Sequence, residues 1–276
     1  MSRAIDVLHL GRDRVICAYE VGGAIVDPGP ASTVETLIDR LGPVEPRALM
    51  LTHIHLDHAG ATGVLCRRYP KLKVYVHELG APHLVDPSKL LKSAGRLYGD
   101  DMWELWGEVA PVPEERITVL SGGETVEGFR VAYTPGHASH HVSYLHEDSG
   151  DAYVGDVAGV RIPPFPYTIA PTPPPDIDVE AWLDSLHTIA CWNAQSLGLT
   201  HFGQTTSVAD HLHRMRMALV DSAERARMKD EETFIARMEQ DLLDATDTAT
   251  VECFEQAAPP NQLYMGLERY WRKKAE

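Results

Sequence analysis

The feature that most constrains this chain is a continuous apolar run, Ala48-Leu49-Met50-Leu51-Thr52, followed directly by a cluster rich in histidine. A run of this length and composition predicts a strand covered on both faces, because a half-exposed strand would alternate apolar and polar residues. The cluster reads His53-Ile54-His55-Leu56-Asp57-His58, so groups with metal-ligand chemistry follow the end of a strand at fixed offsets. This combination predicts an α/β fold with a functional site at the edge of its sheet.

Three later positions repeat the pattern of a strand followed by a metal-ligand residue. His137 follows a predicted strand over residues 129–134, and Asp156 follows another over 152–154. His201 comes directly after a predicted strand over 196–200. Because open α/β sheets tend to build their sites at strand ends, we expect these side chains to complete the same site.

The spacing within the first cluster indicates two metal ions rather than one. A loop that leaves a strand can turn His53 and His55 toward one ion, and Asp57 and His58 toward a second ion about 3.5–4 Å away. Imidazole nitrogens and carboxylate oxygens suit zinc, and they also suit iron or manganese. We therefore expect two divalent metal ions, with Zn²⁺ first and iron or manganese as alternatives.

Composition narrows the remaining classes of function. The chain has 14 His but only 4 Cys in 276 residues, and the scattered cysteines predict buried apolar side chains rather than disulfides or thiolate ligands. The net charge of −15 argues against binding to nucleic acid or to an anionic membrane, which both require a basic surface. With no signal-peptide pattern and no apolar run of membrane-spanning length, we expect a cytoplasmic protein that acts on a small molecule.

The order of the predicted elements indicates two parts. Residues 1–205 contain two successions of strands, helix and strand, which predict a helix–sheet–sheet–helix sandwich. Seven prolines in residues 163–175 predict a stiff loop. Residues 206–276 show apolar stripes at helical spacing, with Ser207-x-x-Asp210 as a predicted capping box, so we expect a helical C-terminal extension packed on the sandwich. This extension either covers the pocket or forms a homodimer face.

The motifs together resemble those of the metallo-β-lactamase fold superfamily, in particular its glyoxalase II and lactonase-like branch. The resemblance rests on T-H-x-H-x-D-H, P-G-H after a strand, G-D and the last strand-borne His, over roughly residues 5 to 205. It implies an α/β fold, namely a four-layer αββα metallo-β-lactamase sandwich with a helical C-terminal extension. It also implies a first metal ion on His53, His55 and His137, a second on Asp57, His58 and His201, and Asp156 as the bridge between them.

The activity implied is that of a dinuclear metal-dependent hydrolase, in which a metal-bridging hydroxide attacks an ester, thioester or lactone carbonyl. Asp57 and Asp156 are the expected catalytic carboxylates, and Asp57 orients the hydroxide or moves a proton. One alternative is an enzyme similar to persulfide dioxygenases, with a single iron on His53, His137 and Asp156. Another is a non-catalytic metal-binding or regulatory member of the fold.

Candidate substrate contacts lie outside the ligand set. Tyr98 and Tyr167 belong to segments that could border the mouth of the site, and Trp103 and Trp106 are alternatives to plain core packing. His140 and His141 follow His137 closely, and we expect a structural role for them, with one as a possible hydrogen-bond partner of a ligand.

Overall fold

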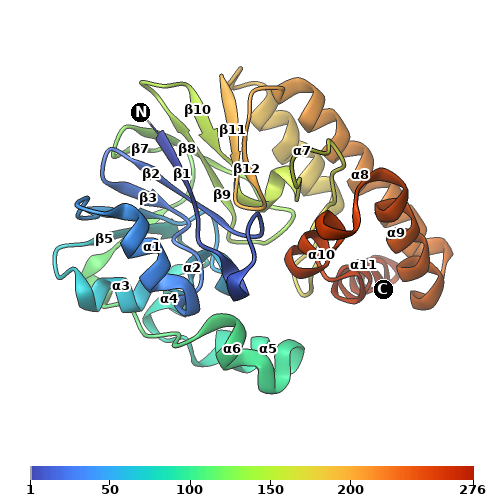
Figure 1. Cartoon of the computed structure of the whole chain (residues 1–276), viewed down its shortest axis with the longest axis horizontal. Coiled ribbons are helices and arrows are strands. Elements are labelled where there is room, and N and C mark those ends of the chain that lie inside the picture. The colour runs from blue at the N-terminus through green and yellow to red at the C-terminus, as the bar shows by residue number, and fades with distance from the viewer. Residues whose placement is uncertain (1) are drawn as a thin grey trace.

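The computed structural model describes residues 2–276 and contains two six-stranded sheets that face each other (Figure 1). The first sheet has the order β1-β2-β3-β4-β5-β6, with β1 (Ser2–Asp6), β2 (Cys17–Val21), β3 (Ala24–Val26), β4 (Ala48–Met50), β5 (Lys73–His77) and β6 (Ile117–Leu120). The second has the order β12-β11-β10-β9-β8-β7, with β7 (Thr125–Val126), β8 (Phe129–Tyr133), β9 (Val142–His146), β10 (Asp151–Tyr153), β11 (Ser196–Leu199) and β12 (Gly203–Thr205).

Strand β4 is buried on both faces, as its unbroken apolar run predicts. Met50 belongs to an apolar cluster between the sheets that includes Tyr144 of the second sheet. Leu49 points the other way, into a larger cluster that includes Leu37 of a covering helix. Since successive side chains of a strand point to opposite faces, β4 supplies side chains to two layers of core.

Helices cover the outer faces and complete the four-layer αββα sandwich (Figure 1). The helices that follow the early strands are α1 (Val34–Leu41), α2 (Leu56–Ala59), α3 (Thr62–Arg68), α4 (Ala81–Val85), α5 (Ser88–Tyr98) and α6 (Met102–Trp106). Helix α7 (Val179–Ala190) lies on the side of the second sheet. Short 3₁₀ turns are η1 (His9–Gly11), η2 (Ala31–Thr33), η3 (Gly99–Asp101), η4 (Glu114–Arg116) and η5 (Gly155–Ala158).

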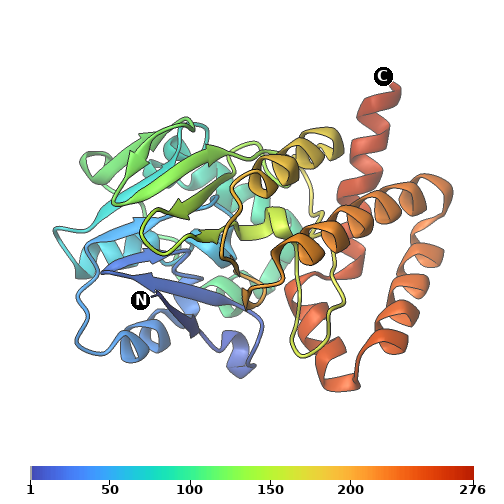
Figure 2. The ribbon, with the colours of Figure 1, turned by 90° about the horizontal axis from the view of Figure 1, so that it is seen from above.

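The C-terminal extension consists of α8 (Val208–Met228), α9 (Glu231–Ala245), α10 (Thr248–Ala257) and α11 (Pro260–Ala275). These helices stand beside the sandwich, and the proline-rich loop runs between the two (Figure 2). The predicted apolar stripe of α8 is buried at Leu212, Met215 and Leu219. The predicted capping box is wrong: the Ser207 side chain makes no cap bond, and the short Asp210 side chain instead accepts a hydrogen bond from Arg214 at 3.1 Å.

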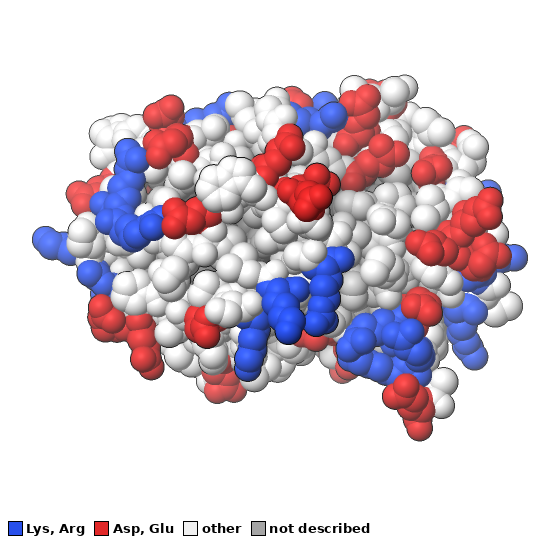
Figure 3. Space-filling view, turned by 90° about the horizontal axis from the view of Figure 1, so that it is seen from below, with Lys and Arg blue, Asp and Glu red and all other residues white. Residues whose placement is uncertain are grey.

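Three further features are the lack of a membrane-spanning helix among the described residues, the placement of the cysteines and the distribution of surface charge. Within residues 2–276, no helix combines the length and apolarity needed to cross a membrane. Cys17, Cys66 and Cys253 are buried as expected, but Cys191 is exposed because it follows the last turn of α7, so that expectation is wrong for it. Acidic and basic side chains are interspersed on the face seen in Figure 3.

Candidate metal centre

The predicted ligands come from separate loops that meet at one edge of the sandwich. Strand β4 of the first sheet leads into residues 53–58, where α2 begins. In the second sheet, β8 and β10 run in the same direction because each is antiparallel to β9, and β11 is parallel to β10. Their carboxyl ends therefore share one edge, where β8 is followed by His137, β10 by Asp156 in η5 and β11 by His201.

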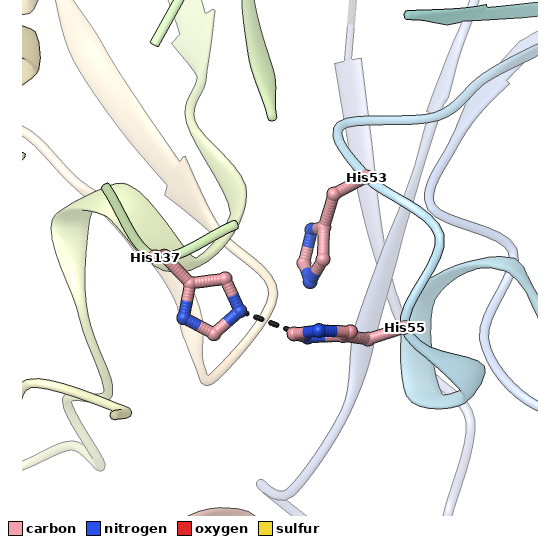
Figure 4. Close-up of side chains that lie close together, drawn as sticks. All are labelled: His53, His55 and His137. Carbon is pink, nitrogen blue, oxygen red and sulfur yellow. Dashed lines mark hydrogen bonds between the residues drawn. The ribbon is translucent and has the colours of Figure 1, made fainter. Parts of the chain in front are cut away.

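His53, His55 and His137 form the first cluster, and one nitrogen of each lies within 4.8 Å of the others. Figure 4 shows their rings converging from two loops, with Nε2 of His137 2.9 Å from Nδ1 of His55. His53 and His137 are buried, whereas His55 is half-buried. Three imidazole nitrogens gathered in this way match the ligand set of a catalytic zinc site with one open position.

Asp57, His58 and His201 form the second cluster, again with one donor atom of each within 4.8 Å of the others. Oδ2 of Asp57 lies 3.2 Å from Nε2 of His201 and 3.8 Å from Nε2 of His58. The two histidines are buried, and Asp57 is the member that reaches solvent, with 21% of its side chain exposed. The cluster thus offers two imidazoles and one carboxylate to a single point.

Asp156 lies between the two clusters. Its Oδ2 is 3.3 Å from Nε2 of His137 in the first cluster, and its Oδ1 is 3.2 Å from Nε2 of His58 in the second. The same Oδ1 is 3.7 Å from Nε2 of His201. One carboxylate therefore faces both groups of ligands, which is the position that a bridging ligand requires.

Several donor atoms at this centre are buried without a hydrogen-bond partner among residues 2–276: Nε2 of His53, His58 and His201, and Oδ1 of Asp156. A buried polar atom left unpaired costs about 1–3 kcal/mol, so such atoms are rarely gathered in one place without a reason. All of them are nitrogens or oxygens of the kind that bind zinc, iron or manganese. The chemistry and convergence of these donors fit a pair of divalent metal ions.

The other ring nitrogen of each buried ligand is held by the surrounding protein. Nδ1 of His137 donates to the Pro171 carbonyl at 2.8 Å, and Nδ1 of His201 to the Val15 carbonyl at 2.6 Å. Nδ1 of His58 donates to Oδ2 of Asp27 at 2.8 Å. These bonds select the tautomer that leaves Nε2 free to face the centre.

Asp27 is the residue that the sequence analysis missed. Its buried carboxylate also accepts hydrogen bonds from the backbone N–H and the hydroxyl of Thr52, at 2.8 and 2.7 Å, and from the hydroxyl of Thr200 at 3.0 Å. Asp27 follows β3, which is the parallel neighbour of β4. The sequence signal that could have identified Asp27 is an acidic residue directly after a strand that neighbours β4.

Gly155 allows the two sheets to approach closely beside the centre. A Cβ atom there would lie 2.5 Å from Oγ1 of Thr52 and 2.8 Å from Nε2 of His141, and the residue has a φ of +47°. A larger residue would therefore be strained and would also push apart the loops that carry Asp156 and His53.

The electrostatics divide the centre into a neutral and a charged half. Burial lowers the pKa of His53 far below its usual value and that of His55 to about 4, so these imidazoles are neutral at pH 7. Burial opposes charge at His58 as well, but Asp156, Asp57 and Asp27 raise its pKa above the usual value.

The carboxylates respond to the same neighbours. Burial works toward a higher pKa for both carboxylates, yet His58 and His201 lower the pKa of Asp57 below its usual value. His58, His137 and His201 do the same for the pKa of Asp156. Both groups are therefore ionised at neutral pH. Binding of metal cations would take the place of the imidazolium protons that balance these carboxylates.

His140 and His141 lie against the first cluster. The His141 ring stacks on His53 at a centroid distance of 5.0 Å, and its Nδ1 shares a 3.0 Å hydrogen bond with Oγ1 of Thr134. The His140 ring meets the His55 ring edge-on at 5.8 Å. Both side chains are buried, so they form part of the packing that surrounds the ligands.

The predicted substrate contacts fall into two groups. Tyr98 packs edge-on against the buried Trp106, and burial together with the charge of nearby Asp57 raises the pKa of Tyr98. Trp103 is 72% exposed. Tyr167 packs against Phe254 of α10 at 5.8 Å. The structure therefore packs Tyr98 and Trp106 against each other, and it places Trp103 at the surface and Tyr167 against the extension.

The chain is similar to several known proteins. It is 29% identical over 73% of its length, and 77% of the relative, to the metallo-beta-lactamase fold-containing protein ST1585 of Sulfurisphaera tokodaii. The solved structure of ST1585 matches with a TM-score of 0.72 and 23% identity over 96% of this chain and 97% of that one.

A hydroxyacylglutathione hydrolase of Synechococcus is 31% identical over 48% of this chain, and the match covers only 42% of that enzyme's length. A solved structure of TTHA1623 in a di-iron-bound form has a TM-score of 0.54 and 25% identity, over 72% of this chain and 91% of that one. The family model of the metallo-beta-lactamase superfamily matches residues 15–190, which is most of the sandwich and every predicted ligand except His201. The chain therefore belongs to the metallo-beta-lactamase superfamily.

Proposed function

We propose that this protein is a metal-dependent hydrolase that binds two divalent metal ions and attacks the carbonyl of an ester, thioester or lactone. The observation that carries the proposal is the convergence of buried, unpaired donor atoms from two clusters on either side of Asp156. The proposed ligands are His53, His55 and His137 for the first ion, Asp57, His58 and His201 for the second, and Asp156 for both.

The proposed chemistry divides the work between the two carboxylates. Two divalent ions held by these residues would supply Lewis acidity, which lowers the pKa of a bound water and polarises a carbonyl. Asp57 is 21% exposed, so it is the carboxylate placed to orient the attacking water and to take up its proton. Asp156 is only 5% exposed and faces both clusters, which suits a bridging ligand. The lowered pKa of Asp57 keeps it ionised as a ligand and as a hydrogen-bond acceptor for the water.

Two alternatives are weaker on the same geometry. A single-iron enzyme needs only His53, His137 and Asp156. It leaves unexplained why Asp57, His58 and His201 also converge within 4.8 Å. A non-catalytic binding protein does not require that one of the ligands, Asp57, reaches solvent. Because one structural relative was solved in a di-iron-bound form, iron should be tested together with zinc and manganese.

The test combines metal analysis with a panel of substrates. We expect two equivalents of metal per chain, hydrolysis of at least one thioester, lactone or simple ester, and loss of that activity on chelation. Since some relatives are named hydroxyacylglutathione hydrolases, an S-acylated glutathione belongs on the panel. A result of one iron per chain with thiol-dependent oxygen uptake would contradict this proposal and support the dioxygenase alternative. Full metal content without turnover would favour the non-catalytic alternative.

Tyr98 and Trp106 stay proposed substrate contacts, and the charge of Asp57 acts on the Tyr98 hydroxyl by raising its pKa. If the Tyr98 hydroxyl binds the substrate, Tyr98→Phe lowers kcat/KM by about two- to tenfold, the usual effect of one hydrogen bond, and leaves metal content unchanged. Tyr264→Phe, which alters a tyrosine on α11, is the matched control. Equal kcat/KM for Tyr98→Phe and the unaltered protein would remove Tyr98 from the contacts.

A further inference from the structure

Helix α11 lies directly on the proline-rich loop. Gly266 meets this loop so closely that a Cβ atom there would lie 1.9 Å from the Thr172 carbonyl oxygen. The Thr172 hydroxyl donates to the Leu263 carbonyl at 3.0 Å, and Nε of Arg269 donates to the Pro175 carbonyl at 3.1 Å. Thr172 and Leu263 are buried, so the loop has little freedom to move relative to the helix.

The same loop holds a ligand of the first cluster. The Pro171 carbonyl, one residue before Thr172, accepts the 2.8 Å hydrogen bond from Nδ1 of His137. This bond directs Nε2 of His137 toward His55 at 2.9 Å and toward Asp156 at 3.3 Å. The contacts therefore run without interruption from α11 through Thr172 and Pro171 to His137.

We propose that α11 is a positioning element for the first metal cluster: by seating Gly266 on the Thr172 carbonyl, it fixes the Pro171 carbonyl that orients His137. The proposal rests on the metal sites of the proposed function. Partners that orient a ligating histidine typically change metal affinity 10- to 100-fold when they are lost. A Cβ atom at position 266 has no room unless the helix or the loop moves, and movement of the loop displaces the Pro171 carbonyl.

The test compares two glycine-to-alanine substitutions in helices. Gly266→Ala adds a methyl group against the Thr172 carbonyl, whereas a Cβ atom at Gly95 in α5 meets nothing within 4 Å. Both changes favour helix formation by about the same amount, so the control cancels that effect. The probe is Zn²⁺ alone, titrated in competition with a chelating dye, with circular dichroism as the check of folding.

We expect Gly266→Ala to weaken one of the two zinc-binding steps about tenfold or more and to spare the other. Gly95→Ala should leave both steps unchanged. A general loss of stability would not weaken one step selectively. A folded Gly266→Ala protein with both steps unchanged would overturn the proposal.

A second variant covers the case in which Gly266→Ala does not fold. Thr172→Val removes the hydrogen bond to Leu263 and adds no bulk, and we expect it to weaken the same zinc-binding step about two- to tenfold. Unchanged zinc binding by folded Thr172→Val would then overturn the proposal. The unaltered protein separates the two ideas, because its failure to bind two zinc ions would refute the proposed function itself.

Discussion

At the scale of single residues, the centre depends on groups that are not ligands. Asp27 shows this best, because its one carboxylate holds His58, Thr52 and Thr200 and so connects loops of both sheets. Four hydrogen bonds at one buried carboxylate keep its orientation fixed, which in turn fixes the ring of His58. Asp27 thus positions a proposed ligand through the ring nitrogen that faces away from the centre.

Substitution of a proposed ligand tests the metal assignment directly. We expect His55→Ala and Asp156→Ala to lose metal and hydrolytic activity together, because each removes a donor that no neighbour replaces. His213→Ala, which alters an exposed histidine of α8, should retain both. Elemental analysis and turnover of the best panel substrate provide the measurements. Retention of full metal content and turnover by Asp156→Ala would refute its assignment.

At the scale of elements, α8 attaches the extension to the site-bearing half through a buried histidine. Nε2 of His211 donates to the Ala158 carbonyl at 2.8 Å, at the end of η5, the turn that carries Asp156. The His211 side chain is buried, and burial lowers its pKa to about 4. Its neutral form is therefore the form that the folded protein accommodates.

This lowered pKa predicts a specific sensitivity to acid. The unfolded chain gains a proton on His211 near pH 6.5 and the folded chain only near pH 4, so its contribution to stability is complete above pH 6.5 and is lost progressively below it. Between pH 7.5 and 5 the loss is about 2 kcal/mol. We expect His211→Gln to lose correspondingly less stability over this range, measured by urea unfolding.

The control for this prediction is His213→Gln, because His213 lies on the same helix but is exposed. Its stability should depend on pH in the same way as that of the unaltered protein. If His211→Gln also kept the full pH dependence, the buried imidazole would not be the responsible group.

The main elements and the proximity of the ligand residues could be predicted from the sequence. The apolar run of β4, the strands of the second sheet and the stripe of α8 follow from periodicity, because burial itself creates the pattern. The proximity of residues 53–58 to His137 and His201 was predictable because the ends of similarly directed strands share an edge.

The supporting contacts were not predictable in this way. The carbonyls of Pro171 and Val15 hold His137 and His201, but every residue has a carbonyl, so no residue type marks them. The failed capping box at Ser207 has a similar cause, since the backbone N–H of Ser207 donates to the Thr205 hydroxyl at 3.4 Å, a contact that only the folded chain defines. Trp103 and Trp106 lie on the same short helix, α6, and only the packing of that helix shows that Trp106 is buried and Trp103 exposed.

At the scale of the whole molecule, the apolar core is continuous. One cluster of buried residues extends from Leu49 and Val157 in the sandwich to Leu219 and Leu267 in the extension. The predicted division at residue 205 is therefore not accompanied by a break in packing. Two parts that share a core lose much of their stabilisation when separated.

We expect the protein to unfold in one step. In scanning calorimetry of the metal-depleted protein, the calorimetric and van't Hoff enthalpies should agree, because α8 and α11 cannot leave without exposing apolar side chains of the sandwich. Loss of circular dichroism should coincide with the change in tryptophan fluorescence. A separate early transition of a size suited to residues 206–276 would instead show that the extension is an independent domain.

The close contact between Gly266 and Thr172 also bears on how the chain is made. All proposed ligands, from His53 to His201, leave the ribosome before α11 does, so a nascent chain carries the complete ligand set without the helix that braces the proline-rich loop. A premature stop between residues 202 and 259 would yield a polypeptide with every ligand and no brace. Such a product is expected to bind metal at the first cluster more weakly than the finished chain does, so that cluster is expected to load only after translation is complete.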